Sequence, residues 1–143
     1  MARNKTLSSG SHRMPQAEVV GAERQAELDA LVVEWLTLAE VAEREKVAPS
    51  QVRKQIQDRE LVAVRRGQRR VLSVPAAFLT ESGPRPELRG TVTVLSDGGM
   101  SDVELLIWLF TPDLTLPVPG TALGALMAGH KTEVRRRAME SAF

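Results

Sequence analysis

The sequence of 143 residues contains no cysteine and only two histidines, His12 and His130. Without cysteine the chain has no disulfide, no thiolate zinc site and no cysteine nucleophile. Two histidines near opposite ends do not favour a metal site or a catalytic set centred on histidine, and no glycine-rich phosphate loop accompanies the scattered carboxylates. These absences predict a protein that is not an enzyme and that uses no metal and no cofactor.

Long apolar runs are missing as well. The stretch 105–110 is far shorter than the roughly 20 residues that cross a bilayer, and the N-terminus lacks the apolar core of a signal peptide. We therefore expect a cytoplasmic protein with no membrane partner. Residues 1–16 are polar and aperiodic, which is typical of a disordered tail.

The net charge of +1 conceals strong segregation of charge along the chain. Residues 17–43 hold seven acids and one base, whereas residues 44–70 hold nine bases and three acids. A polyanion responds to the local field rather than to the total charge, so the basic block is where such a partner would bind. The first part of the acidic block, residues 17–35, is expected to form an N-terminal helix or a linker.

Residues 37–45 have the pattern of a short capped helix. Thr37 and Glu40 are spaced as a capping box, in which each side chain bonds the backbone N–H of the other residue. Leu38, Val41 and Ala42 follow with the spacing of one helical face. The pattern predicts an amphipathic helix that ends near Glu45.

A second helix is expected after a tight turn, because Pro49 suits the first position of a helix. Val52 and Ile56 form its apolar seam. Its outward side chains match the chemistry of base edges, since Arg and Lys suit guanine and Gln suits adenine. The layout is that of a helix-turn-helix, and the alternative is a solvated helical hairpin. The candidate DNA-contacting residues on this helix are Ser50, Gln51, Arg53, Lys54 and Gln57.

Two strand-like runs, 61–66 and 69–74, follow at once. Gly67 suits a two-residue type II′ turn with Gln68. This register places Arg66 opposite Arg69 and Arg65 opposite Arg70, and such like-charge pairs destabilise a hairpin. A hairpin that follows a recognition helix is typical of a wing, whose arginines contact phosphates or the minor groove. The alternative is a charged hairpin whose arginines only keep its tip soluble. The candidate wing contacts are Arg65, Arg66, Gln68, Arg69 and Arg70.

Residues 36–79, with the capped helix, the Pro-Ser before the second helix, the strand LVAVRR and the basic wing, resemble the excisionase-like and MerR-like winged helix-turn-helix families. The resemblance implies a DNA-binding unit. Ala48 departs from the family pattern, because a serine usually caps the second helix there, and its loss costs on the order of 1 kcal/mol of helix stability. Gln55 also departs from it, at a position that is often aromatic.

The C-terminal half is expected to be helical. Leu88, Val92 and Leu95 keep helical spacing up to the Gly98-Gly99 break. Ser101 and Glu104 form a second capping box, and the buried face of the helix that follows is expected to comprise Val103, Leu106, Ile107 and Phe110.

A proline-rich loop, residues 112–119, leads to a short apolar helix at 122–127 and a closing helix at about 131–142. The closing helix carries Arg135, Arg136 and Arg137. These arginines are interpreted as a solvated face near a helix C-terminus, where the helix dipole favours cations, or as an additional phosphate contact.

The elements LVAVRR, SDGGMSD, WLFTPD and EVRRRAM together are similar to small mycobacterial-type winged-helix DNA-binding regulators with an appended helical C-terminal domain. This resemblance covers nearly everything from Leu36 to Phe143 and implies an actinobacterial, cytoplasmic, nucleoid-associated regulator without a cofactor. Residues 101–138 also look, more loosely, like the toxin-binding domain of Xre-type antitoxins.

The sequence therefore predicts a mainly α fold with a small β-hairpin wing. The expected divisions are a disordered tail at 1–16, an acidic helix or linker at 17–35, a winged helix-turn-helix at 36–80 and a helical C-terminal domain at 86–143. The expected function is double-stranded DNA binding by a transcriptional regulator, either a monomer or a homodimer. The alternative is a protein-interaction module that acts through the C-terminal helices.

One regulatory hypothesis concerns the N-terminal tail. Thr6 lies close to Arg3 and Lys5 among hydroxyl-bearing residues. Phosphate on Thr6 would add roughly −1.5 to −2 charges to a segment that otherwise follows DNA. We therefore expect a Ser/Thr protein kinase as a second partner, although such hydroxyl residues are more often plain linker.

Overall fold

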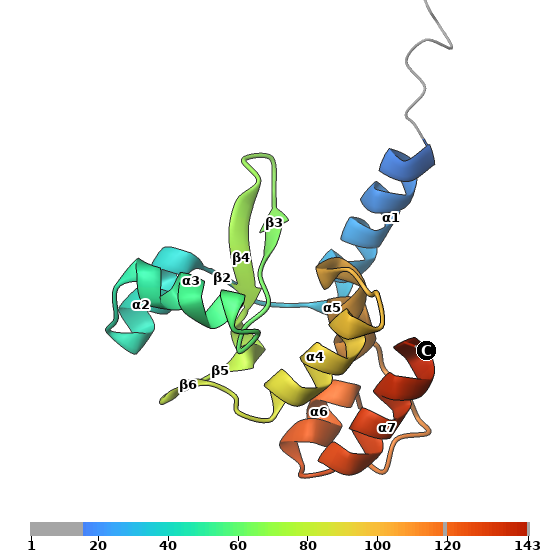
Figure 1. Cartoon of the computed structure of the whole chain (residues 1–143). Coiled ribbons are helices and arrows are strands. Elements are labelled where there is room, and N and C mark those ends of the chain that lie inside the picture. The colour runs from blue at the N-terminus through green and yellow to red at the C-terminus, as the bar shows by residue number, and fades with distance from the viewer. Residues whose placement is uncertain (1–15, 119, 143) are drawn as a thin grey trace, which may run out of the picture.

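The computed structural model describes residues 16–118 and 120–142. Helices dominate it and a small antiparallel sheet accompanies them, as the sequence predicted (Figure 1). The elements up to the hairpin turn are α1 (Gln16–Leu31), β2 (Trp35–Thr37), α2 (Leu38–Glu45), α3 (Pro49–Gln57) and β3 (Val64–Arg66). After it come β4 (Val71–Pro75), the 3-10 turn η2 (Ala76–Phe78), β5 (Leu79–Thr80), β6 (Gly83–Pro84), α4 (Leu88–Asp97), α5 (Asp102–Phe110), α6 (Ala122–Met127) and α7 (Lys131–Ala142).

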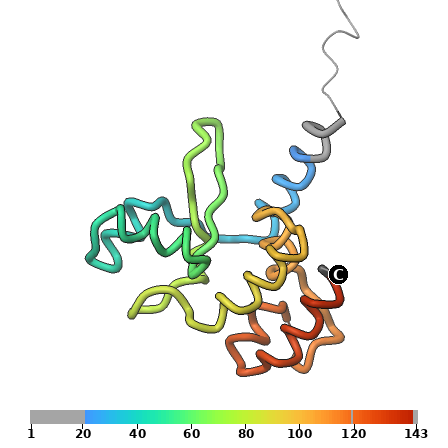
Figure 2. The backbone as a smooth tube through the Cα atoms, in the orientation of Figure 1, coloured from blue at the N-terminus to red at the C-terminus, as the bar shows by residue number. Residues whose placement is uncertain are grey.

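The hairpin of β3 and β4 stands out from the body of the molecule. Helices α2 and α3 lie to one side of it and α1 rises on the other, while α4 to α7 gather beyond its base (Figure 1 and Figure 2). The free surface of the hairpin tip and the outer face of α3 are therefore both open to a partner.

The helix-turn-helix forms as expected. The Thr37 hydroxyl accepts from the Glu40 N–H at 3.2 Å, and the Glu40 carboxylate accepts from the Thr37 N–H at 2.8 Å. Helix α2 ends at Lys46, whose φ of 61° is left-handed. Pro49 is at the start of α3, and Ala48 provides no side-chain cap. Both the capping box and the uncapped second helix are thus confirmed.

A third strand, β2, was not expected from the sequence. It pairs antiparallel with β4, with Trp35 opposite Pro75 and Leu36 opposite Val74, and gives the strand order β2-β4-β3. Thr37 is both the last residue of this strand and the N-cap of α2. Strand β2 ties the acidic N-terminal segment to the wing.

The predicted hairpin register was wrong. Arg65 is paired with Leu72 and Arg66 with Val71, so the expected arginine pairs across the strands do not form. The turn contains four residues, Gly67 to Arg70, instead of two. It is closed by a hydrogen bond from the Arg70 N–H to the Gly67 carbonyl at 3.1 Å. Both of these residues have a positive φ, 75° at Gly67 and 56° at Arg70. The longer turn keeps the like charges at the tip from facing each other.

One apolar core joins the winged unit to the C-terminal helices. Phe78, in the 3-10 turn η2, is fully buried and stacks on Phe110 of α5 with ring centroids 5.8 Å apart. Helix α1 also packs against α5, with Leu28 fully buried. The hairpin and α3 therefore project from a base that includes both halves of the chain.

The C-terminal helices also form as expected. Gly98 caps α4, and the Ser101–Glu104 capping box begins α5. Leu106 and Ile107 are buried and Val103 and Phe110 half-buried, but Leu105 and Leu109 are buried too, so α5 is enclosed on more sides than predicted. Whether the C-terminal helices also bind a protein partner stays a prediction.

Two of the three arginines of α7, Arg136 and Arg137, have carboxylate partners within the chain. Arg136 and Arg137 both donate to Glu133 at 2.7 Å, Arg136 also pairs with Glu140, and the Arg135 guanidinium lies against Gly90 of α4. Their hydrogen bonds lower the pKa of Glu133 from 4.5 to about 2, with Arg136 the largest cause. The interpretation as free phosphate contacts does not fit Arg136 and Arg137, and for Arg135 it stays a prediction.

Glu133 should make the stability of the protein depend on pH in the acid range. Its folded pKa lies below the unfolded value, so its contribution is complete above about pH 4.5 and is lost as the pH falls towards about 2. Glu133→Gln is expected to lower the melting temperature at neutral pH, and thermal unfolding followed by circular dichroism should show the difference from wild type shrinking between these two values. Asp97→Asn, at an exposed acid of α4, should show no such convergence, and a difference that stays constant for Glu133→Gln would contradict the assignment.

Candidate nucleic-acid interface

The outward face of α3 carries the hydrogen-bonding residues expected for base recognition. All five predicted contacts on this helix have exposed side chains: Ser50, Gln51, Arg53, Lys54 and Gln57. Lys54 bonds Asp58 at 3.2 Å, but a surface pair of this kind contributes little and leaves the ammonium group available. The face is accessible along its whole length.

The opposite face of α3 fixes its orientation. Val52 is fully buried and Ile56 is half-buried against the core. The Gln55 amide donates to the Glu45 carboxylate at 2.8 Å and so ties α3 to α2. Gln55, which departs from the family pattern expected from the sequence, thus makes a polar link between the two helices.

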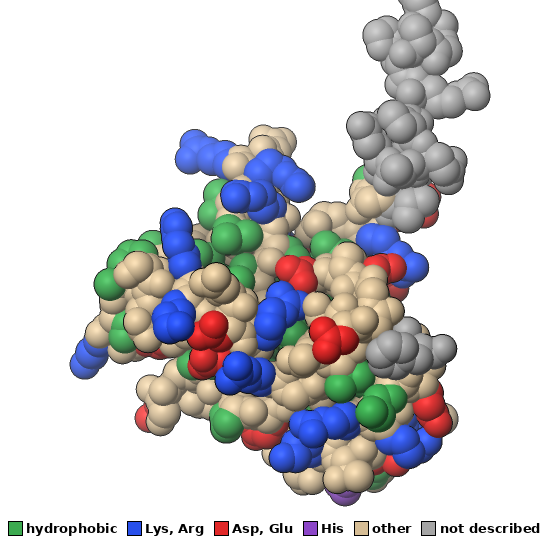
Figure 3. All heavy atoms as spheres, in the orientation of Figure 1, with side chains coloured by type: hydrophobic (Ala, Val, Ile, Leu, Met, Phe, Trp, Pro, Cys, Tyr) green, Lys and Arg blue, Asp and Glu red, His purple; other side chains and the backbone are tan. Residues whose placement is uncertain are grey.

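The tip of the hairpin is the second basic surface. Gln68, Arg69 and Arg70 are exposed in the turn, and the Arg65 guanidinium donates to the Arg70 carbonyl at 3.0 Å. Among the described residues, no carboxylate lies within ion-pair distance of Arg65, Arg69 or Arg70. Figure 3 shows lysine and arginine side chains at the hairpin tip and over the α2–α3 pair on the same face. We name the tip residues 65 and 67–70 the wing tip.

Arg66 does not belong to the wing tip, although it was predicted to contact DNA with its neighbours. Its Nε and Nη2 donate to Asp29 of α1 at 3.1 and 3.0 Å, and its guanidinium carbon lies 4.4 Å from the centre of the Trp35 ring. A cation held by a carboxylate and an aromatic face is already satisfied. Arg66 therefore anchors the end of β3 next to the turn to α1, and we call this contact the wing anchor.

Comparison with known proteins places these features in a family. A family model described as the DNA-binding protein Rv2175c wHTH domain matches residues 25–79, and one described as the Rv2175c C-terminal domain of unknown function matches residues 86–142. DNA-binding protein Rv2175c from Mycobacterium tuberculosis (strain ATCC 25618 / H37Rv) is 40% identical over 117 residues, which cover 74% of this chain and 79% of that protein. This chain belongs to the Rv2175c family.

The solved structure titled "NMR structure of Rv2175c" has the same fold. It superposes with a TM-score of 0.69 at 35% identity, over 77% of this chain and 82% of that one. The predicted resemblance to mycobacterial winged-helix proteins with a helical C-terminal domain is confirmed. The Rv2175c wHTH match begins inside α1 and includes Asp29, so both ends of the wing anchor lie within it.

A second ion pair connects the Rv2175c-type winged unit to the C-terminal helices. Arg59 follows α3 in the left-handed conformation, with φ of 63°, and its Nη2 donates to Asp102 in the first turn of α5 at 3.0 Å. Sequence reasoning did not find this contact. Its partners are 43 positions apart and no local pattern links them.

Other classes of site receive no support from the part of the chain that the structure covers. No group of three or more His, Asp or Glu side chains among the described residues could hold a metal ion. No helix within the same ranges is long and apolar enough to span a membrane.

The wing anchor is expected to restrain β3 at the end of the hairpin next to the turn. Asp29→Asn should remove the carboxylate charge from Arg66 and destabilise the fold by about 1 kcal/mol or less, because the pair is partly exposed. The backbone amides of β3 should then exchange with deuterium faster than in wild type.

Glu23→Gln provides the matched control, since Glu23 is an exposed acid on the same helix. Hydrogen–deuterium exchange measured by NMR should show no change in β3 for that variant. If Asp29→Asn and Glu23→Gln gave the same β3 exchange rates, the anchor would have no role in holding the hairpin.

Proposed function

We propose that this member of the Rv2175c family binds double-stranded DNA and regulates transcription. Helix α3 would lie in the major groove, and the wing tip would contact the sugar-phosphate backbone or the minor groove. The observation that carries this proposal is the pairing of an exposed hydrogen-bonding helix face with arginines that have no carboxylate partner among the described residues. A relative named as a DNA-binding protein supports it further.

The contrast with the other arginines strengthens the electrostatic part of the proposal. Arg66, Arg136 and Arg137 are held by carboxylates of the chain, whereas Arg69 and Arg70 extend from a turn with positive-φ residues at both ends. Like charges gathered on a turn repel one another, and a polyanion relieves that repulsion. Phosphate contacts of this kind position a protein on DNA without reading its sequence.

Sequence reading is assigned to α3. Arg53 and Lys54 suit the O6 and N7 acceptors of guanine, and Gln51 and Gln57 suit the donor and acceptor of adenine. These side chains lie on a short helix fixed by Val52 and Gln55, so the fold sets their positions relative to one another.

The proposal includes neither catalysis nor a cofactor, and it extends to association with the nucleoid. A homodimer would require paired half-sites about one helical turn apart, whereas a monomer would need a single short site. Oligomeric state and the kinase partner stay predictions. Thr6 lies outside the described residues.

The wing tip should determine how strongly DNA binding depends on salt. Replacing Arg69 and Arg70 with Gln is expected to remove two phosphate contacts and to make the slope of log K against log salt shallower by about 1.8. Fluorescence anisotropy on random-sequence duplex DNA across a salt series measures this slope.

Arg136→Gln is the matched control, because it removes an exposed arginine that is already paired with Glu133 and Glu140. Its slope should equal that of wild type. An unchanged slope in the Arg69 and Arg70 variant would refute the role of the wing tip.

Helix α3 should determine which sequences are preferred. After selection of a preferred site from a random duplex pool, Arg53→Ala should reduce the affinity ratio between selected and random DNA by about tenfold, since a bidentate base contact contributes about 1–3 kcal/mol of discrimination. Arg44→Ala, at an exposed arginine of α2, should leave the ratio unchanged. If Arg53→Ala weakened both duplexes by the same factor, α3 would contact only the backbone.

A further inference from the structure

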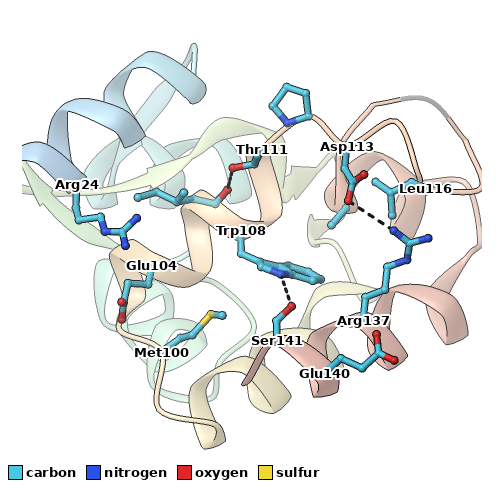
Figure 4. Close-up of a pocket in the computed structure, with 13 residues that line it drawn as sticks. Arg24, Met100, Glu104, Trp108, Thr111, Asp113, Leu116, Arg137, Glu140 and Ser141 are labelled. Atoms are coloured by element: carbon cyan, nitrogen blue, oxygen red, sulfur yellow. Dashed lines mark hydrogen bonds and ion pairs between the residues drawn. The ribbon is translucent and has the colours of Figure 1, made fainter. Parts of the chain in front are cut away.

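A cavity of 510 Å³ lies among α1, α5, the loop 112–116 and α7, away from both basic surfaces (Figure 4). Most of its surface is apolar. The apolar lining comprises Met100, Ile107, Trp108, Pro112, Leu116 and Ala122. Its volume lies within the range of about 300–1,000 Å³ that is typical of small-molecule sites.

Trp108 forms a rigid wall of this cavity. Its indole N–H donates to the Ser141 hydroxyl at 3.0 Å, which fixes the ring and uses its only hydrogen-bond donor. Figure 4 shows the ring between Arg24 on one side and the Asp113–Arg137 pair on the other. The wall therefore offers an apolar surface flanked by charged groups.

The carboxylates that line the cavity are already satisfied. Glu104 accepts from the Ser101 N–H at 2.9 Å, Asp113 accepts from the Thr115 hydroxyl and N–H at 2.6 and 2.9 Å, and Glu140 accepts from Arg136 at 2.7 Å. The hydrogen bonds from Ser101 lower the pKa of Glu104, and those from Thr115 lower the pKa of Asp113. These carboxylates already accept hydrogen bonds from groups of the chain, so the cavity does not favour a cation.

Arg137, one of the two cations in the lining, is satisfied too. It donates to Glu133 and to the carbonyl oxygen of Thr115, both at 2.7 Å, and lies 3.5 Å from Asp113. A bound anion would have to displace contacts that already neutralise its charge.

Arg24 is different. Among the described residues its only acceptor is Glu27, at 3.4 Å, in an exposed pair three positions apart on α1. Such a pair contributes little, and four of the five guanidinium N–H donors have no acceptor in this part of the chain. In Figure 4 the guanidinium extends from α1 towards Glu104 and the Trp108 side of the cavity.

We propose that this cavity binds a small organic carboxylate with an apolar body. The carboxylate would accept hydrogen bonds from Arg24, and the apolar body would pack against Trp108, Ile107 and Met100. Glu104 accepts from the Ser101 N–H at the start of α5, and the nearby Arg24 charge also contributes to its lowered pKa, so a bound carboxylate would share the Arg24 charge with Glu104. The site does not depend on the proposed DNA binding.

The test uses octanoate as the probe and the full chain as the receptor. Titration followed by ¹H–¹⁵N correlation NMR resolves two indole N–H signals, one from Trp108 in the cavity and one from Trp35 beneath Arg66. We expect saturable movement of the Trp108 signal with octanoate while the Trp35 signal stays in place. Octanamide, which has the same apolar chain without the charge, should bind about tenfold more weakly.

Arg24→Gln is the decisive variant, since Arg24 is on the surface and its replacement leaves the core intact. It should reduce octanoate affinity to that of octanamide, whereas Arg44→Gln, which removes an exposed arginine outside the cavity, should bind octanoate as wild type does. Equal affinity for octanoate and octanamide, equal affinity of Arg24→Gln and wild type, or a Trp108 signal that does not move would each overturn the proposal.

Discussion

The stacking of Phe78 on Phe110 joins the two halves of the chain, and the rest of the structure depends on this shared core. A winged unit of this size has little interior of its own, and domains of about 60 residues or fewer are only marginally stable. Here the C-terminal helices supply the missing apolar surface, and α1 closes the same core through Leu28. The positions of α3 and the hairpin are consequently set by packing that lies far from the basic surfaces themselves.

Arginine has several roles in this molecule, and the local partner decides between them. Arg59 and Arg66 fasten the winged unit to α5 and α1, Arg137 ties α7 to the loop before α6, and Arg69 and Arg70 face solvent. The total charge of +1 says nothing about this division. Among the arginines, those that the chain leaves without carboxylate partners are the ones most available to a polyanion.

Local patterns predicted most of the fold. The capping boxes at Thr37 and Ser101 involve residues three positions apart, and Pro49 determines the start of α3 by its own chemistry, so each could be identified from a few letters. The candidate residues on α3 could be chosen for the same reason, since helical periodicity separates Val52 and Ile56 from the outward side chains. Whether those side chains contact DNA stays a prediction.

Long-range features could not be predicted in this way. The hairpin register depends on the left-handed conformation of Arg70, which arginine adopts rarely, and β2 is too short to show an alternating pattern. The wing anchor and the pair between Arg59 and Asp102 depend on tertiary packing that brings distant residues together. The sequence therefore indicated which residues are basic, but only the fold showed that Arg66 is paired with a carboxylate while the neighbouring arginines are not.

The wing anchor also affects the entropy of binding. A hairpin that was mobile along its whole length would lose the conformational freedom of both strands on meeting a partner, and that loss would weaken the complex. With Arg66 fixed between Asp29 and Trp35, the strands are already ordered in the free protein. If the wing contacts DNA as proposed, only the turn from Gly67 to Arg70 would still have to become ordered, so most of the loss of conformational freedom would already have taken place when the chain folded.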